Sequence, residues 1–200
     1  MEVERTPLTF DEVHNWDDDT RWELLDGRTY AMSSPSVLHQ DVVLALALRL
    51  SPQFQGGPCR LYTAPLDVKL SENDLVQPDL FVVCQPGQNK GGYIDGAPRL
   101  IVEVLSPSTQ RHDRIRKLDL YGKSAVAECW LVTPHPFMVE VYTNLGGLFA
   151  RVCAASEKDG FRSQAFPELK LDLAELFASL PPAGALDEVR EATPGYLTYQ

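Results

Sequence analysis

Residues 99–109 read Arg-Leu-Ile-Val-Glu-Val-Leu-Ser-Pro-Ser-Thr, and this segment says most about the architecture. An apolar run of this length, rich in β-branched residues, predicts a buried strand from Arg99 to Leu105. Ser106-Pro107 ends the strand, and the Ser and Thr that follow are residues that cap helices. We therefore expect a buried strand that leads into a helix and carries one carboxylate, Glu103.

The segment that follows predicts a helix from about Gln110 to Lys123 and a second buried strand from Ala127 to Thr133. A strand, a helix and another strand in this order suit a right-handed crossover between parallel strands. The centre of the chain therefore predicts two parallel strands with a helix packed on the sheet.

Turn and cap residues divide the rest of the chain into further elements. The order predicts a mixed α/β (α+β) fold, with one mixed central β-sheet flanked by helices. We expect one domain over residues 1–180 and a tail rich in Pro, Gly and acidic residues over 181–200. The expected elements are a short helix after Thr9, a hairpin over Arg21–Met32 that turns at Asp26-Gly27, a helix over Ser36–Ser51, strands over Leu61–Leu70, Pro78–Cys84, Phe137–Thr143 and Leu148–Ala154, and a helix over Ala174–Leu180.

The composition limits where the protein works. No apolar run is long enough to cross a membrane, and the acidic N-terminus lacks the apolar core of a secretory signal, so we expect a cytoplasmic protein that binds no membrane.

Four cysteines lie far apart and form no C-x-x-C motif. We therefore expect buried thiols, neither disulfides nor a zinc site, at Cys59, Cys84, Cys129 and Cys153.

The charge is unevenly distributed. The net charge is −10, yet residues 99–123 carry six basic against three acidic side chains, whereas residues 1–30 carry three basic against nine acidic. A local basic patch can attract an anionic ligand even on an acidic protein. The alternative is an ordinary solvated helix face.

Asp79 and Glu103 each interrupt a strand that otherwise looks buried. Burying a carboxylate without a partner is costly, and two carboxylates on neighbouring strands repel one another unless a cation lies between them. A hard cation such as Mg²⁺ accepts such a pair, with waters completing its coordination. The alternative is that each acid lies at a strand end, where it is solvated or pairs with an arginine.

The helix after Glu103 offers a basic partner. Asp113, Lys117 and Tyr121 recur every four residues and so lie along one face of that helix. Lys117 either pairs with Asp113 within the helix or reaches back to Glu103, where it would assist catalysis. Further polar residues that we expect near the site are Glu23, His39, Asp67 and Ser106; His39 and Asp67 are equally compatible with purely structural roles.

In this context the chain resembles the Uma-two family of the PD-(D/E)XK restriction-endonuclease-like superfamily. The resemblance spans roughly residues 22–180. It is carried by the motifs Trp22-Glu23-Leu24-Leu25-Asp26-Gly27, Ser34-Pro35-Ser36-Val37-Leu38-His39-Gln40, Ala64-Pro65-Leu66-Asp67-Val68, Gln77-Pro78-Asp79, Val102 to Thr109, Asp113-Arg114, Lys117 and Tyr121.

The resemblance implies a restriction-endonuclease-like core and hydrolysis of phosphodiester bonds that depends on Mg²⁺ or Mn²⁺. It makes Asp79 and Glu103 metal ligands and catalytic acids, and it adds the backbone carbonyl of Val104 as a third ligand. The superfamily signature places lysine two residues after the second acid, where this chain has Leu105. The resemblance implies that the family moves that lysine to the following helix, which would make Lys117 the catalytic lysine.

The leading hypothesis is therefore a metal-dependent endodeoxyribonuclease. DNA is the expected partner, and a homodimer is expected because duplex cleavage needs two sites. The alternatives are a catalytically inactive nucleic-acid-binding or assembly module on the same fold, and a metal hydrolase of smaller substrates. Serine chemistry is disfavoured because no G-x-S-x-G motif is present. The side chains expected to contact nucleic acid are Arg111, Arg114 and Arg116.

Overall fold

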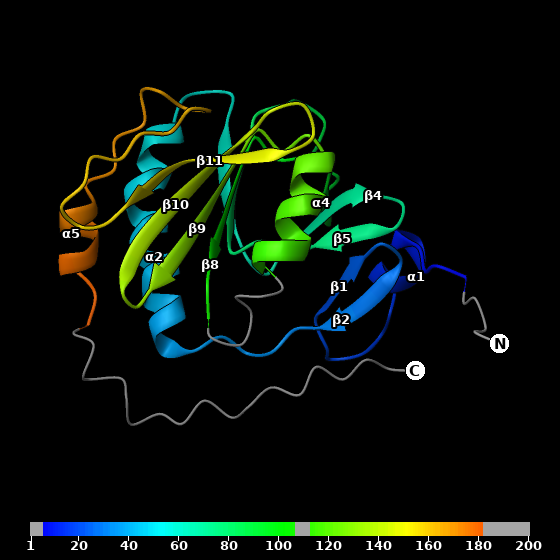
Figure 1. Ribbon diagram of the computed structural model, residues 1–200. Coiled ribbons are helices and arrows are strands. Elements are labelled where there is room, and N and C mark those ends of the chain that lie inside the picture. The colour runs from blue at the N-terminus through cyan, green and yellow to red at the C-terminus, as the bar shows by residue number, and fades with distance from the viewer. Residues whose placement is uncertain (1–5, 107–112, 182–200) are drawn as a thin grey trace.

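The computed structural model describes residues 6–106 and 113–181, apart from the side chains of Asp113 and Arg114. Within these residues the strands form two mixed sheets with helices packed against them (Figure 1). The mixed α+β class predicted from the sequence is confirmed, whereas the single sheet is wrong, because a five-stranded sheet lies beside the central one. The expected tail lies outside the described residues from position 182 onward.

The central sheet has six strands and contains the parallel pair expected from the sequence. β8 and β9 pair in parallel, with Glu103 opposite Leu131, and the other neighbours are antiparallel. In spatial order the strands are β11 (Phe149–Ala155), β10 (Phe137–Asn144), β9 (Glu128–Pro134), β8 (Leu100–Val104), β6 (Leu80–Val83) and β3 (Arg60–Thr63).

The second sheet includes the predicted N-terminal hairpin and three strands that the sequence pattern did not separate. The expected strand over Leu61–Leu70 is two strands in different sheets, because Pro65 has no backbone N–H with which to continue a ladder. The strands are, in spatial order, β2 (Arg28–Ala31), β1 (Trp22–Leu25), β5 (Asp74–Val76), β4 (Asp67–Ser71) and β7 (Tyr93–Asp95).

The helices begin where cap residues stand. Thr9 forms a capping box with Glu12, and the hydroxyl of Ser36 accepts the backbone N–H of His39. In the described part of the chain no helix is long and apolar enough to cross a membrane. The helical elements are α1 (Phe10–His14), α2 (Val37–Leu50), the 3₁₀ turn η1 (Ser51–Phe54), the π-helical turn η2 (Asp113–Lys117), α4 (Leu118–Lys123) and α5 (Leu173–Ala178).

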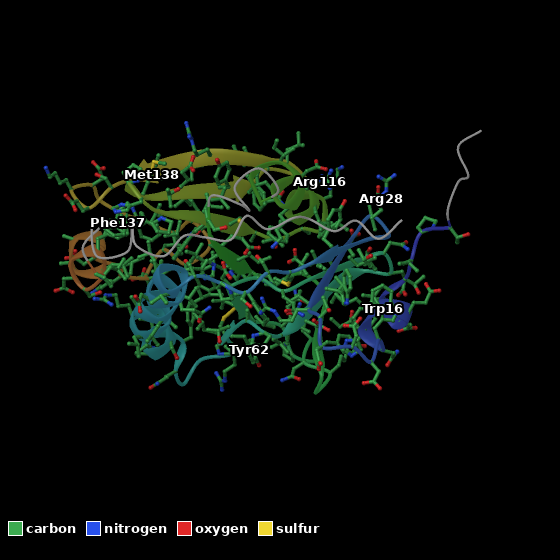
Figure 2. All side chains as sticks on the ribbon, turned by 90° about the horizontal axis from the view of Figure 1, so that it is seen from below. Trp16, Arg28, Tyr62, Arg116, Phe137 and Met138 are labelled. Atoms are coloured by element: carbon green, nitrogen blue, oxygen red, sulfur yellow. A yellow bond between two sulfur atoms is a disulfide. The ribbon has the colours of Figure 1, made fainter. Side chains whose placement is uncertain are left out.

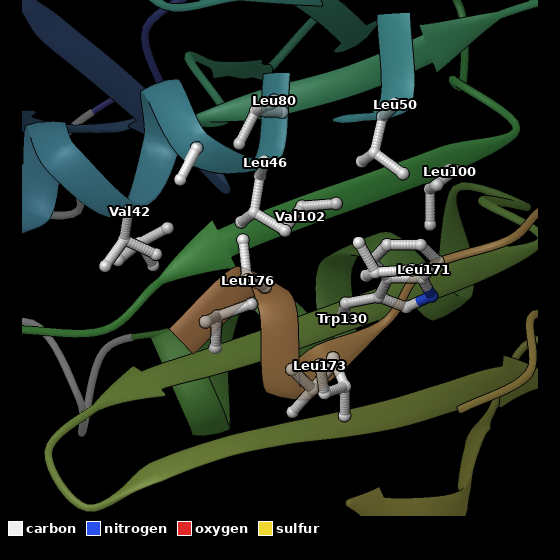
Figure 3. Close-up of a cluster of buried hydrophobic side chains, with 14 of the residues drawn as sticks. Val42, Leu46, Leu50, Leu80, Leu100, Val102, Trp130, Leu171, Leu173 and Leu176 are labelled. Carbon is white, nitrogen blue, oxygen red and sulfur yellow. The ribbon is translucent and has the colours of Figure 1, made fainter. Parts of the chain in front are cut away.

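Two apolar cores lie on opposite faces of the central sheet. On one face α2 and α5 pack against alternate residues of β6, β8 and β9, among them Val102 and Trp130 (Figure 3). On the other face Phe81, Ile101 and Leu131 pack against α4 and the second sheet. Because both faces are covered, β8 is buried along its whole length, and a polar side chain on it must find its partners inside the protein.

The cysteine prediction is wrong for one pair. Cys59 and Cys84 form a disulfide, whereas Cys129 is a buried thiol and Cys153 a half-buried one. The antiparallel register of β3 and β6 explains the pair, because Arg60 opposes Val83 and the next residues outward are the two cysteines. Their Cα atoms lie 4.0 Å apart, across strands that the sequence separates by 25 residues. Spacing along the chain therefore gave no signal for this bond.

Candidate functional site

The start of β6 and the end of β8 bring Asp79 and Glu103 to the same end of the central sheet. The antiparallel register places Leu80 opposite Val102, so one step further Asp79 faces Glu103. A direct contact confirms this proximity, because the backbone N–H of Val104 donates to Asp79 Oδ2 over 2.8 Å. The expectation that these acids lie on neighbouring strands is therefore confirmed.

Asp79 lies at the edge of the protein interior. Its side chain is 18% exposed, and His39 Nε2 lies 3.1 Å from the same Oδ2 that accepts the Val104 N–H. His39 comes from the first turn of α2, which Ser36 caps, so the helix cap fixes the position of the imidazole. The other ring nitrogen of His39 is buried and has no partner among residues 6–106 and 113–181.

Glu103 belongs to a buried ionic cluster. The Lys117 ammonium lies 3.1 Å from Glu103 Oε1 and 2.8 Å from Glu23 Oε1, and the three side chains are between 4% and 6% exposed. Tyr121 donates its hydroxyl to Glu103 Oε1. The lysine that follows in the chain thus reaches back to the acid, as the sequence suggests, and it also binds Glu23 of the N-terminal hairpin.

The Tyr121 hydroxyl is a stable hydrogen-bond donor. Complete burial raises its pKa well above the ordinary value of 10.0, and the charge of Glu103 raises the pKa further, while Lys117 acts in the opposite direction. Tyr121 therefore stays protonated at neutral pH and holds one oxygen of Glu103 from the side of α4.

Two consecutive residues of the π-helical turn η2, an arginine and a lysine, differ in exposure. Lys117 points inward, whereas Arg116 is exposed and donates to the hydroxyl of Tyr30. Its guanidinium also lies 5.3 Å from the centroid of the Tyr30 ring. Tyr30 is the cross-strand neighbour of Glu23, so Arg116 lies just outside the buried cluster, on the same side of the molecule as Arg28 (Figure 2).

The oxygens at this end of the sheet fit a hard divalent cation. Because the Val104 N–H points towards Asp79, the carbonyl of Val104 points to the same edge of β8. Among the described residues, Glu103 and Glu23 share one ammonium, that of Lys117, whereas Asp79 contacts His39. In the same described ranges no three His, Cys, Asp or Glu side chains group closely enough to hold a metal by themselves.

Asp67 lies in a separate part of the same hydrogen-bond network. Its Oδ2 is 2.7 Å from His14 Nδ1, and its Oδ1 accepts from Gln77 Nε2 over 2.8 Å. The backbone N–H of Gln77 donates to Glu23 Oε1 over 3.1 Å, which links Asp67 to the cluster. Sequence reasoning missed His14 and Gln77; the one available signal was the position of Gln77, two residues before Asp79.

The remaining predicted site residues come from positions 106–114 of the sequence. Ser106 stands two residues after the end of β8 and is half-buried. Arg111 lies outside the described residues, as do the side chains of Asp113 and Arg114. The alternative pairing of Lys117 with Asp113 is therefore not visible, whereas its contacts with Glu103 and Glu23 are.

Comparisons with known proteins agree with this fold. The crystal structure of a protein titled "putative nuclease belonging to DUF820", from Anabaena variabilis ATCC 29413, superposes with a TM-score of 0.67 over 88% of this chain and all of that one, at 20% identity. An uncharacterised Synechocystis protein, slr1290, is 30% identical over 128 residues, which are 62% of this chain and 67% of that protein. The family model Uma2, described as "Putative restriction endonuclease", matches residues 10–174, and the chain therefore belongs to the Uma2 family.

Proposed function

We propose that this protein is a divalent-metal-dependent endodeoxyribonuclease whose site consists of Asp79, Glu103 and Lys117. The observation that carries the proposal is the Lys117 ammonium, which lies 3.1 Å from Glu103 although the superfamily signature position is Leu105. A lysine that reaches the second acid from the next helix supplies the missing basic group. Membership in a family described as restriction endonucleases supports DNA as the substrate class.

The metal would be held by Asp79, Glu103 and the carbonyl of Val104, with waters as further ligands. Mg²⁺ and Mn²⁺ suit such oxygen donors, since Mg²⁺ keeps several waters and uses few protein carboxylates. Such an ion supplies Lewis-acid chemistry, because it lowers the pKa of bound water and neutralises charge on phosphate. The partial exposure of Asp79, 18%, leaves its carboxylate accessible from solvent.

The side chains of the protein perform the remaining steps. In the hydrolysis an oxygen of water bonds to phosphorus while the bond from phosphorus to the leaving oxygen breaks, and a proton passes to that oxygen. Lys117 stabilises the negative charge that builds up on the phosphoryl oxygens, and Tyr121 and Glu23 keep Glu103 and Lys117 in place. His39 orients Asp79 through the contact at 3.1 Å. Arg116, exposed beside the cluster, contacts the DNA backbone.

Plasmid nicking tests the proposal. Supercoiled DNA is incubated with the protein and Mg²⁺ or Mn²⁺, beside Asp79→Ala and Glu103→Ala. Each substitution should lower the cleavage rate at least about a thousandfold, which corresponds to about 4 kcal/mol of transition-state stabilisation. Asp119→Ala, which removes an exposed carboxylate of α4, is the matched control and should cleave like the wild type.

Two outcomes would contradict the proposal in different ways. Cleavage that survives both Asp79→Ala and Glu103→Ala would place the activity elsewhere or in a contaminant. If the wild type does not cleave, calorimetric titration with Mn²⁺ separates the remaining possibilities. Absence of binding at millimolar Mn²⁺ would favour a catalytically inactive module, which the net charge of −10 also suits. The homodimer and the cytoplasmic location stay predictions.

A further inference from the structure

Gln77 makes two contacts that together span the candidate site. It stands just after β5, two residues before Asp79, and is 9% exposed. Its backbone N–H donates to Glu23 Oε1 over 3.1 Å, and its side-chain amide donates to Asp67 Oδ1 over 2.8 Å. Gln77 thus binds both Glu23 of β1 and Asp67 of β4, and it stands in the segment that carries Asp79.

Asp67 is itself held on its other side. His14 Nδ1 lies 2.7 Å from Asp67 Oδ2, and the His14 ring stacks on Phe10 with centroids 4.8 Å apart. Both oxygens of Asp67 therefore have partners, one from α1 and one from Gln77. A carboxylate fixed in this way is a rigid acceptor for the Gln77 amide.

The contact with Asp67 also fixes which way the Gln77 amide faces. Turning the amide over would place its oxygen against the carboxylate, and the two acceptors would repel one another. In the orientation that results, Gln77 Oε1 is buried and has no partner within residues 6–106 and 113–181. A buried acceptor without a donor costs stability, so the stability of the core alone does not explain a glutamine at this position.

We propose that Gln77 is a positioning residue, anchored by Asp67, that holds Glu23 and Asp79 in their places in the site. The anchored side chain fixes the backbone at position 77. That backbone binds Glu23 directly and, through Pro78, sets where Asp79 meets the N–H of Val104. The effect on cleavage rests on the proposed function, whereas the effect on local structure does not.

The test replaces Gln77 by Met, which is similarly long and flexible but has no amide. Gln88→Met is the matched control, because Gln88 is 8% exposed and its side-chain amide donates to the carbonyl of Ala97, between β7 and β8. For Gln77→Met we expect kcat to fall about tenfold to a hundredfold with KM for DNA unchanged within about twofold. The Val104 amide should exchange with solvent about tenfold faster by NMR, since its acceptor Asp79 is no longer held. Gln88→Met should change neither quantity.

A second variant shows whether Gln77 acts through Asp67. Asp67→Ala removes the anchor but leaves Gln77 in place, so it should reproduce both effects, and the double variant should be no worse than either single one. Additive losses, or a Val104 exchange rate that stays at the wild-type value in Gln77→Met, would overturn the proposal. If the wild type cleaves no DNA, the proposed function fails, and the exchange rate of Val104 still decides whether Gln77 positions Asp79.

Discussion

Two buried carboxylates on neighbouring parallel strands have different kinds of partners. Glu128 starts β9 and is fully buried, and its oxygens accept four neutral donors: Trp130 Nε1, the Ser163 hydroxyl, and the backbone N–H groups of Gln164 and Ala165. Glu103, near the end of β8, is 3% exposed and meets an ammonium and a phenol instead. Both acids are buried, yet only one has partners that can carry charge.

Neutral donors and charged partners place different constraints on a buried carboxylate. Glu128 joins the strand to the loop at residues 163–165, and neutral donors in fixed places leave no position for a further ligand. Glu103 shares the Lys117 ammonium with Glu23 and lies opposite Asp79, so its described neighbours include charged groups and further carboxylates. Burial alone therefore does not distinguish the two acids, whereas the charge of their partners does.

The largest expected effect is the loss of the Glu128 network. Glu128→Ala should lower the free energy of unfolding by about 4–5 kcal/mol, because it leaves a buried indole N–H, a hydroxyl and two backbone N–H groups without an acceptor. Urea denaturation followed by circular dichroism measures the change. Glu168→Ala, at an exposed glutamate, is the control and should change stability by less than about 0.5 kcal/mol. A loss of under about 1 kcal/mol in Glu128→Ala would show that the network is not structural.

A smaller effect is expected for the ionic cluster. Lys117→Met leaves Glu23 and Glu103 buried beside each other without their ammonium, and should lower the free energy of unfolding by about 3 kcal/mol. Adding Glu23→Gln should recover part of that loss, because one of the two charges is then gone. The same urea experiment on the single and double variants gives the coupling energy. No recovery in the double variant would mean that the two carboxylates do not share Lys117.

The sequence predicts the elements of the site better than the arrangement of the sheets. Asp79, Glu103 and Lys117 could be predicted because each is a charged residue in or next to a strongly patterned element. The second sheet could not be predicted. β5 and β7 have three residues each, which is too short for a periodic pattern, and the parallel pairing of β7 with β4 leaves no local signal in the sequence.

The long-range partners escaped prediction for a similar reason. Three of the four donors to Glu128, at positions 163–165, are separated from it by about 35 residues along the chain, and Cys59 and Cys84 meet only through the register of β3 and β6. His14 binds Asp67 from 53 residues away. Such pairs depend on how the sheets pack, and nothing in the residues themselves distinguishes them from solvated side chains.

The smallest expected effect concerns the hydroxyl that Tyr121 donates to Glu103. Tyr121→Phe should cost about 1 kcal/mol at pH 8, where the phenol is protonated and bonded. Because burial raises the pKa of Tyr121 in the folded protein, the unfolded chain loses this proton first as the pH rises past about 10. The stabilisation from Tyr121 is thus fully present below pH 10 and declines above it. The difference in unfolding free energy between wild type and Tyr121→Phe, measured in urea at pH 8 and pH 11, should therefore shrink or change sign at the higher pH. A difference that is the same at both values would mean that Tyr121 ionises as readily in the folded protein as in the unfolded chain.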